Sequence, residues 1–498
     1  MATISRLWLV FGYLLCAGGM ALAKDPSTVP WTLPELFTRV PPLTHDALGR
    51  LPLIVIEPFR LTPEDRSFEE AKPLPAEVIK GLAVRGLTQW IPPDARYIPF
   101  ALALQQAGAR VVFMEGNAFN GPAGEVPDGL HQLPADFVRD PEQPAQQPHY
   151  PCPLLLEGWR QKADSLRAML KKYKDAGVQV DAAWLDWEIE PYPGKSQWNE
   201  ARACSRCRAQ FPPGVLDDFQ RYRAFITRWR QSLFSTYVVA PFLEAYPTCS
   251  VTNWEVVISS PETPTPNWSG LRDIPPVSLG MFNTANPVVY GNTLWCKYHW
   301  QEAWQWPLDV PHMDRVYTAV MLGEISAHCA NALRSAPDSR SVPWVDRFCA
   351  DDRDPKIPIL SRVRYREILR HCWLRGTDSM QIFNPNWFPT DPTYQAIVTE
   401  EVEDVVQVYD EMLAYRPILE RGQVMNTAAP GITDNGPIWS GRRLGDTVLL
   451  RAFTQATRAV QVTITPFSDA DPVTLSCPPN GATYLLTRQD KRVKVERK

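Results

Sequence analysis

The chain has 498 residues, a formal net charge of −4 and no long run of either charge sign. Nucleic-acid binding needs a basic surface, so this balance argues against a nucleic-acid partner. The length suits one large domain with a smaller one beside it, and a core of that size is stable without disulfide bonds.

The first 23 residues have the pattern of a secretory signal peptide. Arg6 precedes a short apolar run, and the segment ends in Ala21-Leu22-Ala23, which is typical of a cleavage site. The apolar run is too short to cross a membrane comfortably. We therefore expect a secreted or periplasmic protein that has no membrane attachment after cleavage.

Residues 24–48 are rich in proline and lack periodicity, which predicts an entry segment. After it, short apolar runs alternate with amphipathic helices along most of the chain. The expected strands lie at 53–56, 111–114, 180–189, 250–257, 277–282, 288–290, 342–345 and 378–383. The expected helices lie at 96–107, 157–176, 215–245, 312–334, 361–375 and 397–420.

This alternation is typical of a parallel sheet covered by helices. Seven or eight such units predict an α/β fold, a (β/α)8 TIM-like barrel over residues 49–422. A doubly wound sheet is the alternative, but it usually has a glycine-rich turn after its first strand, and Ile56-Glu57-Pro58-Phe59 has none. Residues 423–498 show strand patterns without helices, which predicts a small antiparallel, sandwich-like β-domain.

The segment Asp181–Pro191 has the richest set of carboxylates at the end of a predicted strand. Barrel enzymes place their catalytic groups at the C-terminal ends of strands. Side chains alternate along a strand, so Trp184, Asp186, Glu188 and Glu190 share one side. Neighbouring carboxylates repel each other, which raises the pKa of one of them and suits it to protonate a glycosidic oxygen. We predict that Glu188 is this acid and that Asp186 is its partner.

The same segment resembles the D-x-x-D-x-D-x-E signature of the family 18 chitinases. Asp181, Asp186 and Glu188 match it, and Trp184 stands where the signature has another aspartate. The segment is also similar to the D-W-E of the family 56 hyaluronidases. The resemblance implies retention by substrate assistance on an N-acetylhexosamine, in which the N-acetyl oxygen attacks the anomeric carbon. It implies that Glu188 is the acid/base and that Asp186 positions the acetamido group.

A substrate without an N-acetyl group needs a second carboxylate as nucleophile or base. Glu255 leads the candidates because it ends an apolar strand beside Trp254, and Glu190 is a further choice. Other carboxylates at predicted strand ends are Glu115, Glu57 and Asp346. The sequence leaves open whether hydrolysis retains or inverts configuration.

Aromatic side chains are expected to hold the sugar, because indole rings stack on sugar faces while their N–H groups bond hydroxyls. Trp184 and Trp254 adjoin the carboxylates, and Asn384 and Trp387 follow the last predicted strand. Trp387 is the best single candidate for a substrate floor. The tryptophans within 295–306 either bind sugar or plug the rim of the barrel.

The ten cysteines include Cys16 in the signal segment, so an odd number remains in the mature chain. An oxidising compartment favours disulfides and leaves at least one thiol unpaired. Cys204 and Cys207 have metal-ligand spacing, but no second C-x-x-C follows, so we favour a disulfide that braces a loop. We expect no cofactor and no metal.

The sequence therefore predicts a secreted glycoside hydrolase that acts on a polysaccharide or glycan. Serine hydrolase and zinc protease motifs are absent. The main alternative is a non-catalytic carbohydrate-binding protein on a barrel scaffold. A weaker alternative is metal-dependent carbohydrate modification through Cys204 and Cys207.

Overall fold

The structure is a computed structural model of the chain. It describes residues 33–47, 52–55, 61–62, 65–116, 132–134, 152–186, 195–255, 283–291, 309–335, 340–347, 358–383 and 392–498. The predicted signal segment and the predicted strand at 277–282 lie outside these residues. Within the described ranges, none of the helices has both the length and the apolar character needed to cross a membrane.

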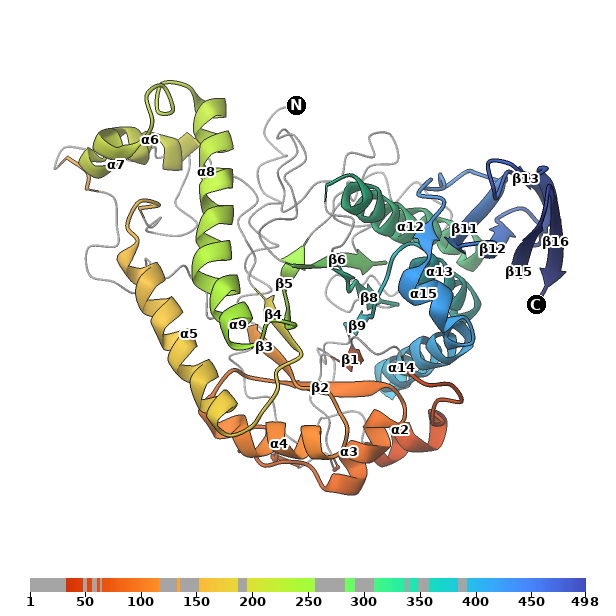
Figure 1. The fold of residues 1–498 in the computed structure, drawn as a ribbon, viewed down its shortest axis with the longest axis horizontal. Helices are drawn as coiled ribbons and strands as arrows, with labels where there is room; N and C mark the ends of the chain where they lie inside the picture. Colours follow the sequence, from red (N-terminus) through yellow and green to blue (C-terminus); the bar gives the residue numbers. More distant parts are fainter. Residues whose placement is uncertain are drawn as a thin grey trace.

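Eight parallel strands form a ring in the middle of the molecule (Figure 1). They are β1 (Leu53–Val55), β2 (Leu87–Ile91), β3 (Val112–Gly116), β4 (Ala182–Asp186), β5 (Ser250–Glu255), β6 (Thr284–Tyr290), β8 (Trp344–Asp346) and β9 (Gln381–Ile382). The ring closes because β1 pairs with β9 and β5 pairs with β6. The short β7 (Arg340–Ser341) pairs with β6 in the same register as β8, so β7 and β8 are one strand interrupted at Pro343.

The register of the ring is that of a TIM barrel. When the residue pairings are followed once around the ring from Trp184, they return to β4 eight residues further along. A parallel barrel of eight strands with this shear has strands tilted by about 36° and an interior that side chains fill.

Side chains at alternate positions of the strands fill this interior. The buried hydrophobic members are Ile54, Val112, Met114, Ala182, Trp184, Val288, Tyr290, Val342 and Trp344. Ala183 and Val289, which alternate with them, belong to the larger core between the sheet and the helices. The sheet therefore separates two cores, and the position of a residue along its strand decides which core it joins.

Helices cover the outside of the ring (Figure 1). They include α3 (Ala76–Ala83), α4 (Ile98–Gln106), α5 (Glu157–Asp175), α8 (Phe219–Phe234), α9 (Ala240–Ala245), α12 (Val310–Ser335), α13 (Arg362–Leu374) and α14 (Pro392–Leu413). On α5 the buried Leu166, Leu170 and Tyr173 lie on one face, as the spacing of an amphipathic helix requires. α2 (Leu33–Arg39) precedes the first strand.

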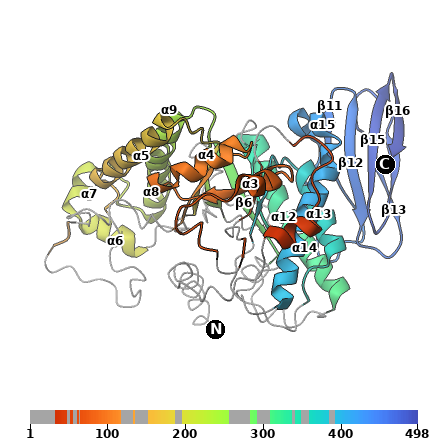
Figure 2. The same cartoon turned by 90° about the horizontal axis from the view of Figure 1, so that it is seen from below.

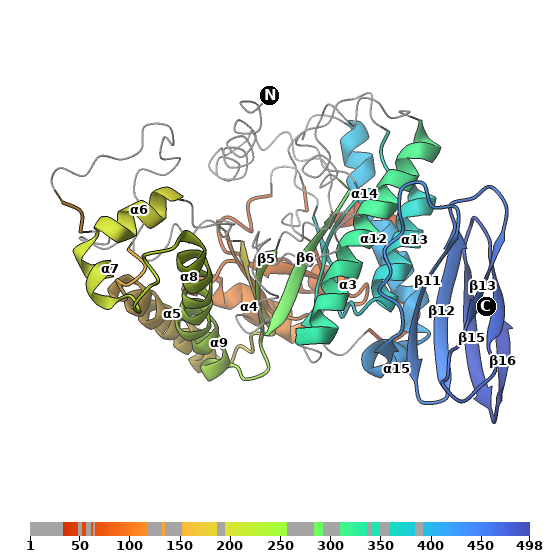
Figure 3. The same cartoon turned by 90° about the horizontal axis from the view of Figure 1, so that it is seen from above.

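The molecule is elongated, with different additions at its two ends. α6 (Lys195–Ala203) and α7 (Ser205–Gln210) lie at one end and the C-terminal strands at the other in all three views (Figures 1, 2 and 3). Both helices belong to the connection between β4 and α8. The C-terminal strands follow α15 (Arg416–Arg421).

The C-terminal strands form an antiparallel β-domain. One sheet contains β10 (Gln423–Val424), β11 (Pro437–Leu444), β12 (Thr447–Thr454), β15 (Ala482–Gln489) and β16 (Arg492–Arg497), and a second contains β13 (Val460–Ile464) and β14 (Val473–Cys477). Val448 and Leu450 of β12 join the core of this domain, whereas Leu449 and Phe453 join the core of the barrel. The predicted fold class, a (β/α)8 barrel with a small C-terminal antiparallel β-domain, is confirmed.

A buried ion pair joins the β-domain to the barrel. Arg451 of β12 donates two hydrogen bonds to Glu367 of α13, at 2.8 and 2.5 Å. His371 Nε2 lies 3.3 Å from the same carboxylate. Burial by itself would raise the pKa of Glu367, but its interactions with His371 and Arg451 outweigh it and lower that pKa to about 2.

We predict that Glu367→Gln lowers the free energy of unfolding by about 3–5 kcal/mol at neutral pH, because it leaves the charge of Arg451 buried without a carboxylate. The pKa of Glu367 is about 2 in the folded chain against an ordinary 4.5. Its stabilising contribution is therefore fully present above pH 4.5 and disappears as the pH falls toward 2. Urea unfolding across this range measures both effects.

Glu244→Gln is the matched control for this experiment. Glu244 also accepts two hydrogen bonds from an arginine, Arg167, but both side chains lie at the surface. Such exposed pairs contribute little to stability. Equal losses of stability in the two variants would show that burial of Glu367 does not matter.

Candidate active site

The last residue of the predicted catalytic strand occupies a position that belongs to the interior-facing series of the barrel. Trp184 of β4 is buried in the interior core, and Asp186 comes two residues later as the last residue of the strand. The register partner of Asp186 is Gly116, which contributes no side chain at that level. The structure describes the backbone of Asp186 but not its side chain, and Glu188 and Glu190 lie outside the described residues.

β5 carries two further candidate residues, one at an interior-facing position of the strand and one at a helix-facing position. Thr252 is the register partner of Trp184, so Trp254 continues the interior series. Glu255 instead continues the series of Val251, which packs in the core under the helices. The side chains of Trp254 and Glu255 are outside the described part of the chain, as are Asn384 and Trp387 altogether.

β8 brings a described carboxylate to the same end of the barrel. Asp346 is the last residue of β8, follows Trp344 in the interior series and has 0% exposure. Its register partner is Tyr290, the last residue of β6. The sequence already marks Asp346 as a carboxylate at a strand end, and the structure adds that it is completely buried beside aromatic side chains.

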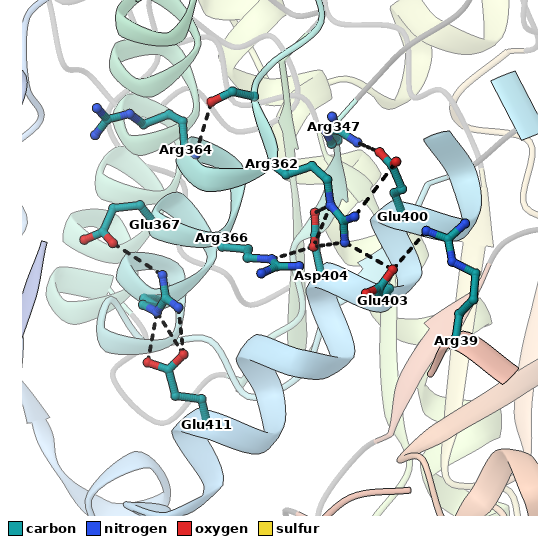
Figure 4. Close-up of polar contacts among 12 residues, drawn as sticks. Arg39, Arg347, Arg362, Arg364, Arg366, Glu367, Glu400, Glu403, Asp404 and Glu411 are labelled. Carbon is teal, nitrogen blue, oxygen red and sulfur yellow. Dashed lines mark hydrogen bonds and ion pairs between the residues drawn. The ribbon is translucent and has the colours of Figure 1, made fainter. Parts of the chain in front are cut away.

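The residue after Asp346 fixes this strand end to the helices behind it. The Arg347 backbone N–H donates to Glu401 Oε1 at 2.9 Å, and its side chain donates to Glu400 Oε2 at 2.7 Å and to the Leu360 carbonyl at 2.9 Å. Figure 4 shows the contact with Glu400. α14 therefore holds the chain immediately next to Asp346 through two consecutive glutamates.

Glu401 is a buried acid whose pKa is raised above its ordinary value. Burial raises its pKa to about 8, although hydrogen bonds from the Arg347 N–H and the Tyr365 hydroxyl oppose the shift. The Tyr365 hydroxyl donates to Glu401 Oε1 at 3.0 Å. In its protonated form the Glu401 carboxyl accepts these two bonds without adding a negative charge of its own behind Asp346.

Ion pairs continue from this point across the helices (Figure 4). Asp404 of α14 is completely buried and accepts hydrogen bonds from Arg362 and Arg366 of α13. Glu403, one residue earlier, pairs with Arg362 and with Arg39 of α2. This network holds together the helices that follow β8 and β9, and it therefore stabilises the position of both strand ends.

Aromatic rings line the interior near Asp346. Tyr290 and Phe383 stack with their ring centres 4.7 Å apart, and Trp344 meets Phe383 edge-on at 5.5 Å. The Trp344 indole donates a hydrogen bond to Asn286. Tyr290 and Phe383 are not among the site residues predicted from the sequence, although each stands at a strand end where the alternation of side chains directs it inward.

Trp184 differs from Trp344 in its hydrogen bonding. Its indole nitrogen is buried and has no acceptor among the described residues. An unsatisfied buried donor costs free energy, so such a group is usually paired with something in the native protein. Trp184 therefore offers an N–H donor in the interior, directly below the strand end of Asp186.

The structure does not show the predicted disulfide between Cys204 and Cys207. Cys204 precedes α7 and Cys207 lies in its first turn. Both sulfur atoms lie in one apolar cluster, where a third cysteine, Cys152, joins them. Sequence spacing missed Cys152 because it is 55 residues from Cys207.

No family model matches the chain, and no curated protein sequence does. Solved structures resemble it over most of its length. An isomaltulose synthase from Klebsiella has 12% identity, covers 89% of this chain and 99% of its own, and gives a TM-score of 0.45. An α-amylase from Geobacillus thermoleovorans has 9% identity, 90% and 98% coverage and a TM-score of 0.43. A GH30 endoxylanase from Clostridium papyrosolvens has 10% identity, 90% and 98% coverage and a TM-score of 0.38.

Identities and TM-scores this low carry no argument about activity. The barrel assignment rests on the strand pairings, and the function must be argued from the residues at the strand ends.

We predict that Glu401→Gln flattens the pH dependence of stability. Because the pKa of Glu401 is raised from 4.5 to about 8, folding favours its protonated form. Its contribution is fully present below pH 4.5 and is lost as the pH rises through 8. Glutamine mimics the protonated form and does not titrate, so the free energy of unfolding of the variant should not fall in this way as the pH rises.

Urea unfolding between about pH 5 and pH 9 measures this difference. Glu244→Gln is again the control. In the wild type the hydrogen bond from Arg167 lowers the pKa of Glu244, so this carboxylate stays ionised throughout that range. Parallel stability curves for the wild type and Glu401→Gln would contradict the prediction.

Proposed function

We propose that the protein is an exported glycoside hydrolase that cleaves a polysaccharide or glycan, with Glu188 as the catalytic acid and Asp186 as its partner. The observation that carries the proposal is the position of β4. This strand ends with Asp186 in the interior series of a closed parallel barrel, at the end where barrel enzymes hold their catalytic groups.

The surroundings of β4 support an acid at this place. Trp184 is completely buried below the strand end, and an apolar neighbour of this kind disfavours a charged carboxylate and raises its pKa. Glu188 follows Asp186 by two residues in the sequence, with the parity that a continued strand would direct inward. A protonated Glu188 would then supply the proton that the leaving oxygen needs.

The strand register favours Asp346 as the second carboxylate of the site, because it gives this residue an interior position. It is buried in the interior series of β8, whereas Glu255 continues the helix-facing series of β5. With Asp346 as nucleophile or base, hydrolysis proceeds on sugars that lack an N-acetyl group. The resemblance to family 18 and family 56 implies the other route, in which the substrate's N-acetyl group replaces this carboxylate.

We predict that Glu188→Gln reduces hydrolysis by about 10²–10⁴-fold, the usual contribution of a general acid, and leaves the fold unchanged. The assay is a glycan panel scored for new reducing ends. Glu77→Gln, an exposed glutamate on α3, is the matched control and should retain full activity. Undiminished hydrolysis by Glu188→Gln on any cleaved glycan would rule out the assignment.

The same panel separates an enzyme from a carbohydrate-binding protein. Glycan binding without any release of reducing ends by the wild-type protein would favour the non-catalytic alternative. Binding that survives in Glu188→Gln while hydrolysis is lost supports the proposed enzyme.

We predict that Asp346→Asn reduces hydrolysis of glycans without N-acetyl groups at least as strongly as Glu188→Gln does. Asparagine keeps the shape of the side chain but cannot act as nucleophile or base. The stereochemistry of the first product, followed by nuclear magnetic resonance, identifies retention or inversion. Full activity of Asp346→Asn on N-acetylated glycans, together with an inactive Glu188→Gln, would instead establish substrate assistance.

A further inference from the structure

Three cysteines meet in an apolar cluster far along the molecule from the β-domain. The Sγ atoms of Cys152, Cys204 and Cys207 all lie within 4.8 Å of one another, and none of the three residues is more than 1% exposed. They come from two parts of the chain: Cys152 lies in the segment before α5, whereas Cys204 lies between α6 and α7 and Cys207 in the first turn of α7. Three buried sulfur atoms converging in this way need an explanation.

The sulfur spacing fits a metal better than a disulfide. Cys152 Sγ and Cys207 Sγ are 3.7 Å apart. A disulfide joins two sulfur atoms at about 2.05 Å. Tetrahedral zinc has Zn–S bonds of about 2.3 Å, which places its thiolate ligands about 3.8 Å from each other. The observed separation is too long for a disulfide and matches the distance between two thiolate ligands of one ion.

The local sequence has the form of a zinc-binding turn. Cys204 and Cys207 provide the C-x-x-C spacing of structural zinc sites, at the start of α7. The Gln132 backbone N–H donates to Cys204 Sγ at 3.2 Å, the kind of contact that offsets the negative charge of a metal-bound thiolate.

The surroundings suit a structural ion rather than a catalytic one. Buried side chains such as Ala201, Phe211 and Tyr222 pack around the three cysteines and form a core separate from that of the barrel. A core of so few residues is weak by itself, and small units of this kind often depend on a metal or on disulfides.

The cluster also connects segments that are distant in sequence. The Ser205 N–H donates to the Gln132 carbonyl at 3.1 Å, and the Trp229 indole of α8 donates to the Pro153 carbonyl at 2.6 Å. A metal bound to Cys152, Cys204 and Cys207 would cross-link these same segments. It would anchor the connection between β4 and α8, which begins directly after Asp186.

We propose that Cys152, Cys204 and Cys207 are three ligands of a structural Zn²⁺ ion that fixes this connection. Binding forms three Zn–S bonds and releases the three thiol protons to solvent, with no change of oxidation state. Zinc suits the site because it prefers thiolates, takes a tetrahedral arrangement and is redox-inert. The site does not depend on the proposed hydrolase activity.

The test is the metal content of the mature protein, expressed with added zinc and freed of loosely bound metal by desalting. We expect about one zinc per chain by mass spectrometry of the elements. The double variant Cys204→Ser/Cys207→Ser should lose it. Cys477→Ser is the matched control, because Cys477 is equally buried but belongs to the β-domain, and it should keep the zinc.

Cobalt substitution of the wild-type protein keeps the proposal testable if the double variant does not fold. Thiolate-to-cobalt charge-transfer absorption with the intensity of a tetrahedral site is expected. Mass analysis of the unreduced chain completes the test. A disulfide between any two of the three cysteines, or a wild-type protein that binds neither zinc nor cobalt, would overturn the proposal.

Discussion

The closed ring of parallel strands is the constraint on which the rest of the structure depends. Closure between β5 and β6 fixes the shear of the barrel, and the shear fixes which residues face inward on every strand. Trp184 and Asp346 become interior residues for this reason, although they lie on strands far apart in the sequence. A slip of one residue in either strand would exchange its interior side chains for those of the helix-facing core.

The helices do more than cover the ring, because they hold the strand ends in place. Three-residue β8 has few ladder hydrogen bonds of its own, and Arg347 compensates by binding Glu400 and Glu401 of α14. Burying the charged form of the Glu401 carboxyl costs free energy, and the raised pKa of Glu401 shows that its protonated form is favoured there. The end of β8 is thus held by Glu400, whose charge is paired with Arg347, and by the buried Glu401.

Much of the fold could be predicted from the sequence, and the exceptions have physical causes. The apolar runs at β3 and β4 are visible because both faces of those strands are buried. β2 gives no such signal, since Thr88 and Gln89 interrupt it, yet both are buried within the sheet and Thr88 bonds the Arg110 carbonyl. At the site, the alternation of side chains along β4 correctly predicts that Trp184 and Ala183 face opposite sides of the sheet. Cys152 could not be found, because its partners are set by tertiary packing rather than by spacing.

The two parts of the candidate site obtain their rigidity in different ways. On the β8 side, charged pairs between α13 and α14 fix the strand from behind, within the main core of the protein. On the β4 side, the following connection carries α6 and α7 away from the barrel into a core of its own. That core is built from apolar side chains packed around the three cysteines. The two sides therefore differ in what surrounds the segment that follows the strand: paired charges beside β8, and apolar side chains with three cysteines around α6 and α7.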